Sequence, residues 1–273
     1  MEGSVIHLDL DTFFVSVERL ENVSLRDRPV IIGGGDRGVV AACSYEARRF
    51  GVHSAMPMKM ARMRCPEAIV LRGDMDRYSR YSRLITEIIA SRAPVYEKSS
   101  IDEFYLDVTG MDRFIGASKW AGELRDYIIK ESGLPISMGL SVNKTVSKVA
   151  TGEAKPCGRL RIEPGSERPF LAPLPVQRIP MIGSKTTQTL NQLGVQRIQT
   201  LQQMPMEMLV QVFGKNGKNI WERANGIDRS KVEPYLERKQ ISTEETFDED
   251  TMDIEFIRRK LIDMTTEVAG KLR

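Results

Sequence analysis

The chain has 273 residues, of which 41% are hydrophobic and 28% are charged; this composition excludes a disordered chain and allows about two domains. Its three cysteines are widely spaced and it has only two histidines, which argues against a disulfide scaffold and against a zinc site. The N-terminus has no basic segment before an apolar one, and no apolar run reaches the roughly 18 residues of a membrane span. We therefore expect a cytoplasmic protein without a signal peptide or membrane contact.

The near-zero net charge of +3 hides two oppositely charged stretches. Residues 144–231 contain 14 basic and 6 acidic residues, whereas residues 233–255 contain 2 basic and 9 acidic residues. A basic block of this size indicates a polyanionic partner such as nucleic acid.

The first 165 residues alternate predicted strands with predicted helices. Strands are expected where apolar residues alternate or run together, at residues 5–10, 29–32, 38–42, 95–96, 100–108 and 136–142. Helices are expected where apolar residues recur at helical spacing, at residues 12–20, 45–50, 57–64, 77–92, 117–131 and 143–151. This mixture predicts an α+β fold.

Beyond residue 164 the pattern changes to a proline-rich linker, and then to short helices over residues 185–226. Within residues 176–195, a helix, a tight hairpin containing Pro180 and Gly183, and a second helix ended by Gly194 predict a helix-hairpin-helix. The amides of such a hairpin, with Lys185 beside them, can hold a backbone phosphate, although an ordinary helical hairpin is the alternative. Residues 240–247 predict one strand and residues 254–272 one helix.

Acidic residues lie at the ends of two apolar strands. IHLDLDTFFVSVE contains Asp9 and Asp11, and SSIDEFYLDVTG contains Asp102, Glu103 and Asp107. A buried carboxylate costs several kcal/mol unless it is paired or binds a metal, and neither strand contains a lysine or arginine. Side by side, the two strands would hold one or two Mg²⁺ or Mn²⁺ ions suited to phosphoryl transfer. The alternative is that these acids are strand-end caps or turn residues.

Together with CSYEARRFGVHSAMP and GLSVNKTVSKVATGEAKP, these two motifs resemble the Y family of translesion DNA polymerases, in its DinB (DNA polymerase IV) branch. The motifs span residues 6–156, and the resemblance continues to the end of the chain. It implies template-directed, low-fidelity DNA synthesis from dNTPs on primer-template DNA, including damaged templates. It also implies a right-hand polymerase with a mixed-sheet palm (1–21 and 76–165), small fingers (22–75), an all-helical thumb (166–233), and a linker with a partial little finger (234–273).

The resemblance also implies roles for individual residues. The catalytic and metal-binding groups would be the carboxylates of Asp9, Asp102 and Glu103 and the carbonyl of Leu10, around two Mg²⁺ or Mn²⁺ ions. The dNTP would be bound by Phe13, Phe14, Tyr45, Arg48 and Lys155, with Phe14 as the steric gate against ribonucleotides. The duplex would be bound by Met181, Gly183 and Lys185. Taken alone, the two phenylalanines fit core packing equally well, and Tyr45, Arg48 and Lys155 fit a solvated surface.

Three residues depart from the family pattern: Ala42 replaces a threonine, Cys157 an asparagine, and Met181 a hairpin glycine. We therefore expect one hydroxyl contact to the triphosphate to be missing and the hairpin amide contact to be shifted. One strand and one helix after residue 240 do not complete a little finger, so we expect a truncated, monomeric chain without the family's C-terminal sliding-clamp peptide. The rival interpretations are a catalytically weak DNA-binding fragment and a nucleotidyl cyclase.

Overall fold

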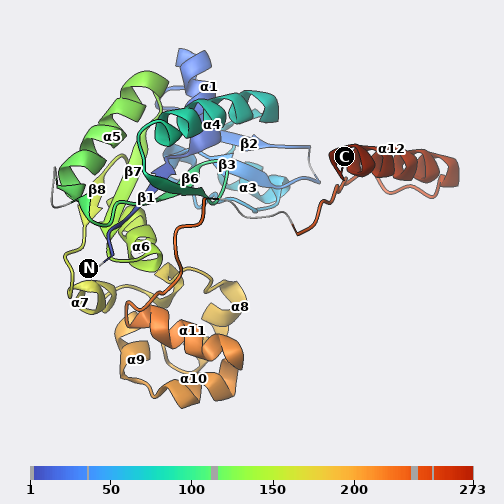
Figure 1. Cartoon of the computed structure of the whole chain (residues 1–273). Coiled ribbons are helices and arrows are strands. Elements are labelled where there is room, and N and C mark those ends of the chain that lie inside the picture. The colour runs from blue at the N-terminus through green and yellow to red at the C-terminus, as the bar shows by residue number, and fades with distance from the viewer. Residues whose placement is uncertain (1–2, 36, 112–115, 235–238, 248, 273) are drawn as a thin grey trace. The chain divides into compact units, whose positions relative to one another are not determined.

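The computed structural model describes residues 3–35, 37–111, 116–234, 239–247 and 249–272. Contacts between residues divide the chain into two units, Met1–Asp11 with Asp76–Pro234 and Thr12–Met75 with Tyr235–Arg273, and each is described by itself (Figure 1). Within the described ranges, none of the helices is both long and apolar enough to span a membrane.

The first unit is built on a five-stranded sheet in the order β5-β6-β1-β7-β8. The strands are β1 (Val5–Leu10), β5 (Val95–Lys98), β6 (Glu103–Asp107), β7 (Ile136–Ser141) and β8 (Arg159–Arg161). The central strand β1 pairs antiparallel with both β6 and β7, and β8 runs parallel to β7. The short strand β8 was not predicted from the sequence, because three residues carry too little pattern.

The two faces of this sheet differ because side chains alternate along each strand. Ile6, Leu8 and Leu10 of β1 point to an apolar face, which α4 (Met75–Ala90) and α5 (Ala117–Ser132) cover (Figure 1). His7 and Asp9 point to the opposite, polar face, where α6 (Lys144–Ala154) lies. Helix α6 can approach because β7 has Gly139 beneath it: a Cβ there would lie 2.1 Å from the Ser147 carbonyl oxygen.

The helical region of this unit (residues 167–224) follows the sheet. It contains α7 (Glu167–Leu171), the 3₁₀ helix η3 (Val176–Arg178), α8 (Ser184–Gln192), α9 (Ile198–Gln203), α10 (Met206–Phe213) and α11 (Lys215–Ala224). One apolar cluster joins Leu190, Leu201 and Leu209 of this region to Val146 and Val149 of α6. Helix α6 therefore packs into the core of the helical region as well as onto the sheet. The first helix of the predicted helix-hairpin-helix is only the single turn η3.

The second unit contains a small sheet in the order β3-β2-β4. Its elements are α1 (Phe13–Glu21), the 3₁₀ helix η1 (Val23–Leu25), β2 (Val30–Gly33), β3 (Val40–Cys43), α2 (Tyr45–Arg49), α3 (Met58–Arg64), β4 (Ile69–Leu71) and α12 (Ile254–Leu272). The prediction of a strand at residues 240–247 is wrong, since these described residues form neither strand nor helix. A strand is stable only beside a partner strand, and no described strand pairs with this segment.

Candidate active site

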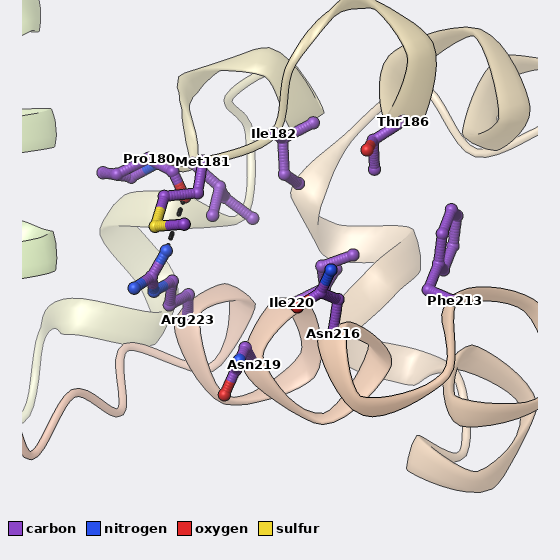
Figure 2. Close-up of a pocket in the computed structure, with 10 residues that line it drawn as sticks. Pro180, Met181, Ile182, Thr186, Phe213, Asn216, Asn219, Ile220 and Arg223 are labelled. Carbon is purple, nitrogen blue, oxygen red and sulfur yellow. Dashed lines mark hydrogen bonds between the residues drawn. The ribbon is translucent and has the colours of Figure 1, made fainter. Parts of the chain in front are cut away.

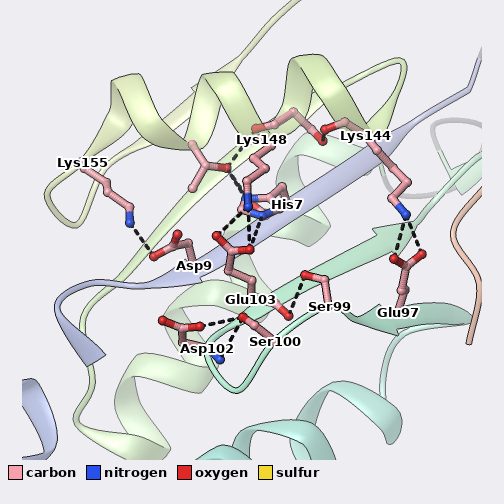
Figure 3. Close-up of polar contacts among 12 residues, drawn as sticks. His7, Asp9, Glu97, Ser99, Ser100, Asp102, Glu103, Lys144, Lys148 and Lys155 are labelled. Atoms are coloured by element: carbon pink, nitrogen blue, oxygen red, sulfur yellow. Dashed lines mark hydrogen bonds and ion pairs between the residues drawn. The ribbon is translucent and has the colours of Figure 1, made fainter. Parts of the chain in front are cut away.

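The acidic ends of β1 and β6 meet on the polar face of the five-stranded sheet, as the sequence predicted (Figure 3). Asp9 and Glu103 are directly opposite each other in the antiparallel register. The Leu10 amide donates a hydrogen bond to the Asp102 carbonyl oxygen at 3.0 Å, which places Asp102 next to the same strand end. Three carboxylates that are far apart in the sequence are thus gathered by one strand pair.

Lys148 of α6 and Lys155, the residue that follows this helix, pair with these carboxylates. Lys155 Nζ lies 2.5 Å from Asp9 Oδ1, and Lys148 Nζ lies 2.6 and 2.5 Å from the two oxygens of Glu103. Neither strand contains a lysine or arginine, and the two cations come instead from α6 and the residue that follows it, across the sheet. Burial raises the pKa of the Asp9 carboxyl to about 7, because the lowering effect of Lys155 does not offset desolvation and the nearby charges of Glu103 and Asp102.

The other two acids of the motifs have structural partners. Asp11 is buried, and its carboxylate accepts hydrogen bonds from Ser137 Oγ at 2.8 Å and from the Cys157 amide at 2.5 Å. It therefore ties β1 to the loop after α6. Asp107 accepts from the Thr109 amide at 2.9 Å and caps the turn after β6. The turn-residue interpretation therefore applies to Asp107, and a structural role applies to Asp11.

His7 is a buried neighbour of the cluster that the sequence analysis did not assign. Its Nδ1 lies 2.9 Å from Thr151 Oγ1 of α6. Its Nε2 lies 4.0 Å from Glu103 Oε2 and finds no hydrogen-bond partner among the described residues. Burial, with the charges of Lys148, Lys155 and Lys144, holds the pKa of His7 well below its usual value, so the imidazole is neutral beside Glu103.

The donor set of this cluster fits a divalent cation. No three acidic, histidine or cysteine side chains of the described residues are already arranged as a metal site, because Asp9 and Glu103 turn toward lysines. However, Asp9 and Glu103 face each other across the strand pair with Asp102 beside them, and all three offer only oxygen. Hard cations such as Mg²⁺ and Mn²⁺ prefer such ligands.

The predicted dNTP residues other than Lys155 belong to the second unit. Phe13 is buried and its ring lies 5.5 Å from that of half-buried Phe14, which packs against the apolar cluster around Val15. On α2, the Arg48 guanidinium lies 5.1 Å from the centre of the Tyr45 ring, so the two side chains share one face. The α2 N-terminus is capped by the Ser44 hydroxyl, which accepts from the Ala47 amide.

The hairpin between η3 and α8 is fixed by a contact from α11. Arg223 Nη1 donates a hydrogen bond to the Pro180 carbonyl oxygen at 2.8 Å, beside a small pocket that Met181 and Ile182 also line (Figure 2). Met181 adopts φ +72°, the left-handed conformation that glycine favours, and its side chain is largely exposed. Lys185 is exposed in the first turn of α8. The backbone thus retains the hairpin conformation expected of the glycine that Met181 replaces.

Comparison with known proteins settles the family. The sequence profile of the impB/mucB/samB family matches residues 8–152, that of a DNA polymerase-iota thumb domain matches residues 177–228, and that of the impB/mucB/samB C-terminal domain matches residues 238–273. The chain belongs to the Y family of DNA polymerases. Its fold class, predicted as a right-hand polymerase of this type, is confirmed.

Curated relatives and solved structures of the Y family align with nearly the whole chain. DNA polymerase IV of Halorhodospira halophila is 42% identical over 98% of the chain and 76% of its own length, and that of Dehalococcoides mccartyi is 40% identical over 98% and 70%. The crystal structure of DinB from Sulfolobus solfataricus has a TM-score of 0.79 at 28% identity, over 98% of this chain and 80% of that one. An insertion ternary complex of Dbh DNA polymerase has a TM-score of 0.75 at 28% identity, with the same coverage.

Two residues on one face of α6, Lys148 and Thr151, were not assigned from the sequence, and Lys144 lies on the same face. Lys144 contacts Glu97 and Lys148 contacts Glu103 (Figure 3). Thr151 contacts His7. With Lys155 they follow the spacing i, i+4, i+7 and i+11, which places them in one row along the helix. This spacing of polar and basic residues on a predicted helix, together with two acidic strand ends, is the sequence pattern that could have indicated these contacts.

Proposed function

We propose that this Y-family chain catalyses template-directed DNA synthesis, transferring dNMP from a dNTP to a primer 3′-OH at low fidelity and on damaged templates. The observation that carries the proposal is the carboxylate cluster at the ends of β1 and β6, with Asp9 and Glu103 in register and Asp102 beside them. The supporting evidence is the match to DNA polymerase IV sequences over nearly the whole chain.

We propose that Asp9, Asp102, Glu103 and the Leu10 carbonyl hold two Mg²⁺ ions, with Mn²⁺ as a substitute. When bound, such ions lower the pKa of the attacking 3′-OH and stabilise the charge on the leaving pyrophosphate. Lys148 and Lys155 then exchange their carboxylate partners for other anions. Lys155, the residue after the last turn of α6, then pairs with a triphosphate oxygen, and its contact with the anionic Oδ1 of Asp9 supports this assignment.

We assign the remaining substrate contacts from the family resemblance. Tyr45 and Arg48 bind the β- and γ-phosphates, since a guanidinium gives a forked, charged contact and the phenol adds a hydroxyl. Phe13 and Phe14 support the nucleotide, and the Phe14 ring excludes a ribose 2′-OH. Met181, Gly183 and Lys185 hold a phosphate of the duplex through hairpin amides and charge, which suits binding to any sequence.

The domain boundaries given by the family resemblance are part of the same proposal: palm at 1–21 and 76–165, fingers at 22–75, thumb at 166–233, and linker with a little-finger segment from 234. A nucleotidyl cyclase binds no DNA and would therefore lack the hairpin region. A binding-only fragment differs from a polymerase in activity alone, so the test has to separate binding from chemistry.

The decisive experiment compares primer extension with primer-template binding for Asp102→Asn combined with Glu103→Gln. Loss of metal-held charge stabilisation is worth several kcal/mol, so extension with Mg²⁺ and dNTPs should fall about 10³-fold or more. Binding, measured by fluorescence anisotropy, should be retained. The matched control is Glu123→Gln with Asp126→Asn, an exposed acidic pair on α5. Extension retained by the first variant, or lost equally in the control, would contradict the assignment.

A further inference from the structure

The segment that leaves α11 is held against the sheet as a strap, defined here as residues 226–233. It forms no helix or strand, and it runs to the end of the first unit at Pro234. Val232 of the strap is buried in an apolar cluster with Val5, Val95 and Tyr105 of the sheet. A segment without secondary structure needs such contacts to stay in one place, because its backbone is not fixed by a hydrogen-bond ladder.

The N-terminus of α6 binds the first half of the strap. Asn143, the N-cap residue, accepts from the Val146 amide at 3.0 Å and donates through Nδ2 to the Gly226 carbonyl oxygen at 2.8 Å. Asp228 of the strap accepts from both the amide and the hydroxyl of Thr145, at 3.0 and 2.8 Å. A carboxylate at this position satisfies a first-turn amide and faces the positive end of the helix dipole.

The charge state of Asp228 agrees with this capping role. Burial raises the pKa of its carboxyl, but hydrogen bonds from Ser230 and Thr145 outweigh burial and hold that pKa below its usual value. The carboxylate is therefore ionised at neutral pH. It also closes a turn within the strap by accepting from the Ser230 amide at 2.9 Å and the Ser230 hydroxyl at 2.6 Å.

A buried ion pair binds the second half of the strap. Lys144 Nζ lies 2.7 Å from both oxygens of Glu97, whose side chain is 7% exposed, and 4.7 Å from the centre of the Tyr105 ring. The pair completes its hydrogen bonds with main-chain groups of the strap. Lys144 Nζ lies 3.4 Å from the Lys231 carbonyl oxygen, and Glu97 Oε2 accepts from the Glu233 amide at 2.9 Å.

An ion pair in this environment does little for stability, since an apolar pair of similar size is often as stable or more so. What an apolar pair cannot do is bind the strap's carbonyl and amide groups. The Glu97–Lys144 pair therefore fixes where the strap lies. This distinction separates a positioning role from a purely structural one.

Helix α6 connects this anchor to the candidate active site. Lys144 begins the helix, Lys148 lies one turn later on Glu103, and Lys155 follows its last turn on Asp9 (Figure 3). The strap itself is the continuation of α11, which fixes the Pro180 carbonyl through Arg223. Helix α6 thus contacts both the acidic cluster and the strap that follows the helical region.

We propose that Glu97, Lys144 and Asp228 are positioning residues for DNA synthesis: by fixing the strap, they hold the helical region, and the duplex bound to it, in register with the carboxylate cluster. This inference rests on the proposed function. Reacting atoms must be placed to within about 1 Å, and a misplacement of that size can lower the rate about 10²-fold. A released strap would therefore lower turnover on primer-template DNA without altering the groups that contact the dNTP.

The test is the double variant Glu97→Leu with Lys144→Met, which removes both charges and so leaves no unpaired buried ion. Its matched control is Glu123→Leu with Lys119→Met, which removes an exposed ion pair from α5. We expect the midpoint of thermal unfolding to stay near that of the native chain in both. We expect trypsin to cut after Arg229 and Lys231 about tenfold faster in the strap variant only, because cleavage follows the open population.

In primer extension we expect the turnover number of the strap variant to be at least about tenfold lower than that of the native chain. The KM for dNTP should stay within about twofold of the native value. Faster cleavage with unchanged extension would overturn the positioning role, and unchanged cleavage would overturn the anchor itself. Cleavage needs neither DNA nor nucleotide, so failure of the strap is seen independently of polymerase activity. Absence of extension by the native chain would instead overturn the proposed function.

Discussion

At the residue scale, Met181 combines a strained backbone with an exposed side chain. Its φ of +72° costs a residue with a Cβ about 1 kcal/mol relative to glycine, and its side chain is 85% exposed. Met181→Gly should therefore be about 1 kcal/mol more stable than Met181→Ala, because both lose the same exposed side chain and only glycine relieves the strain. Urea unfolding of the two variants measures this difference, and equal stabilities would contradict it.

The candidate site was predictable from the sequence as far as it depends on strand ends. Asp9 and Glu103 end apolar strands, and burial of those strands forces their acidic ends together. Lys148 was missed because its contact with Glu103 depends on how α6 crosses the sheet, which the local sequence does not contain. For the same reason the motif did not show that Asp11, two residues after Asp9, accepts hydrogen bonds from Ser137 and from the Cys157 amide.

At the element scale, the approach of α6 to the sheet depends on Gly139. An added Cβ would lie 2.1 Å from the Ser147 carbonyl oxygen and 2.6 Å from the Thr151 amide, both of them α6 backbone atoms that cannot rotate away. Gly139→Ala should therefore displace α6, lower the free energy of unfolding by at least about 2 kcal/mol, and reduce primer extension as Lys148 and Lys155 shift.

The control for this prediction is a glycine within α6 itself. At Gly152 an added Cβ would meet nothing within 4 Å, so Gly152→Ala should keep the packing and raise the helix propensity of α6 by up to about 1 kcal/mol. Urea unfolding and primer extension of both variants give the comparison. A Gly139→Ala chain as stable and active as Gly152→Ala would show that α6 is not held at this distance by the glycine.

The elements themselves were predictable where the pattern was long or the partner local. Helix α5 and strand β1 lie within a residue of their expected bounds, because each has a continuous amphipathic or apolar pattern. The expected strand at 240–247 has such a pattern but no partner strand among the described residues, and without cross-strand hydrogen bonds it forms no strand. Local pattern fixes periodicity, and tertiary contacts decide whether the element forms.

At the scale of the whole molecule, part of the basic block at 144–231 is neutralised within the protein. Its lysines at the sheet pair with Glu97, Glu103 and Asp9. Most of the exposed charge that remains for a polyanion lies on the helical region. Five exposed basic side chains there make no ion pair with any described residue: Arg168, Lys185, Arg197, Lys215 and Lys218. Sequence charge alone therefore overstates the number of phosphates that this block can bind.

The salt dependence of DNA binding should report this smaller number. Each phosphate neutralised contributes about −0.9 to the slope of log K against log salt, so five contacts give a slope of about −4.5 and about a 500-fold loss of affinity between 50 and 200 mM salt. Lys185→Gln should make the slope less negative by about 0.9, whereas Lys119→Gln, which changes an exposed residue of α5, should leave the slope unchanged. Fluorescence anisotropy over that range measures both. A slope near −10 would mean that the paired lysines also release their carboxylates to bind DNA, and a slope near zero would remove the helical region from the interface.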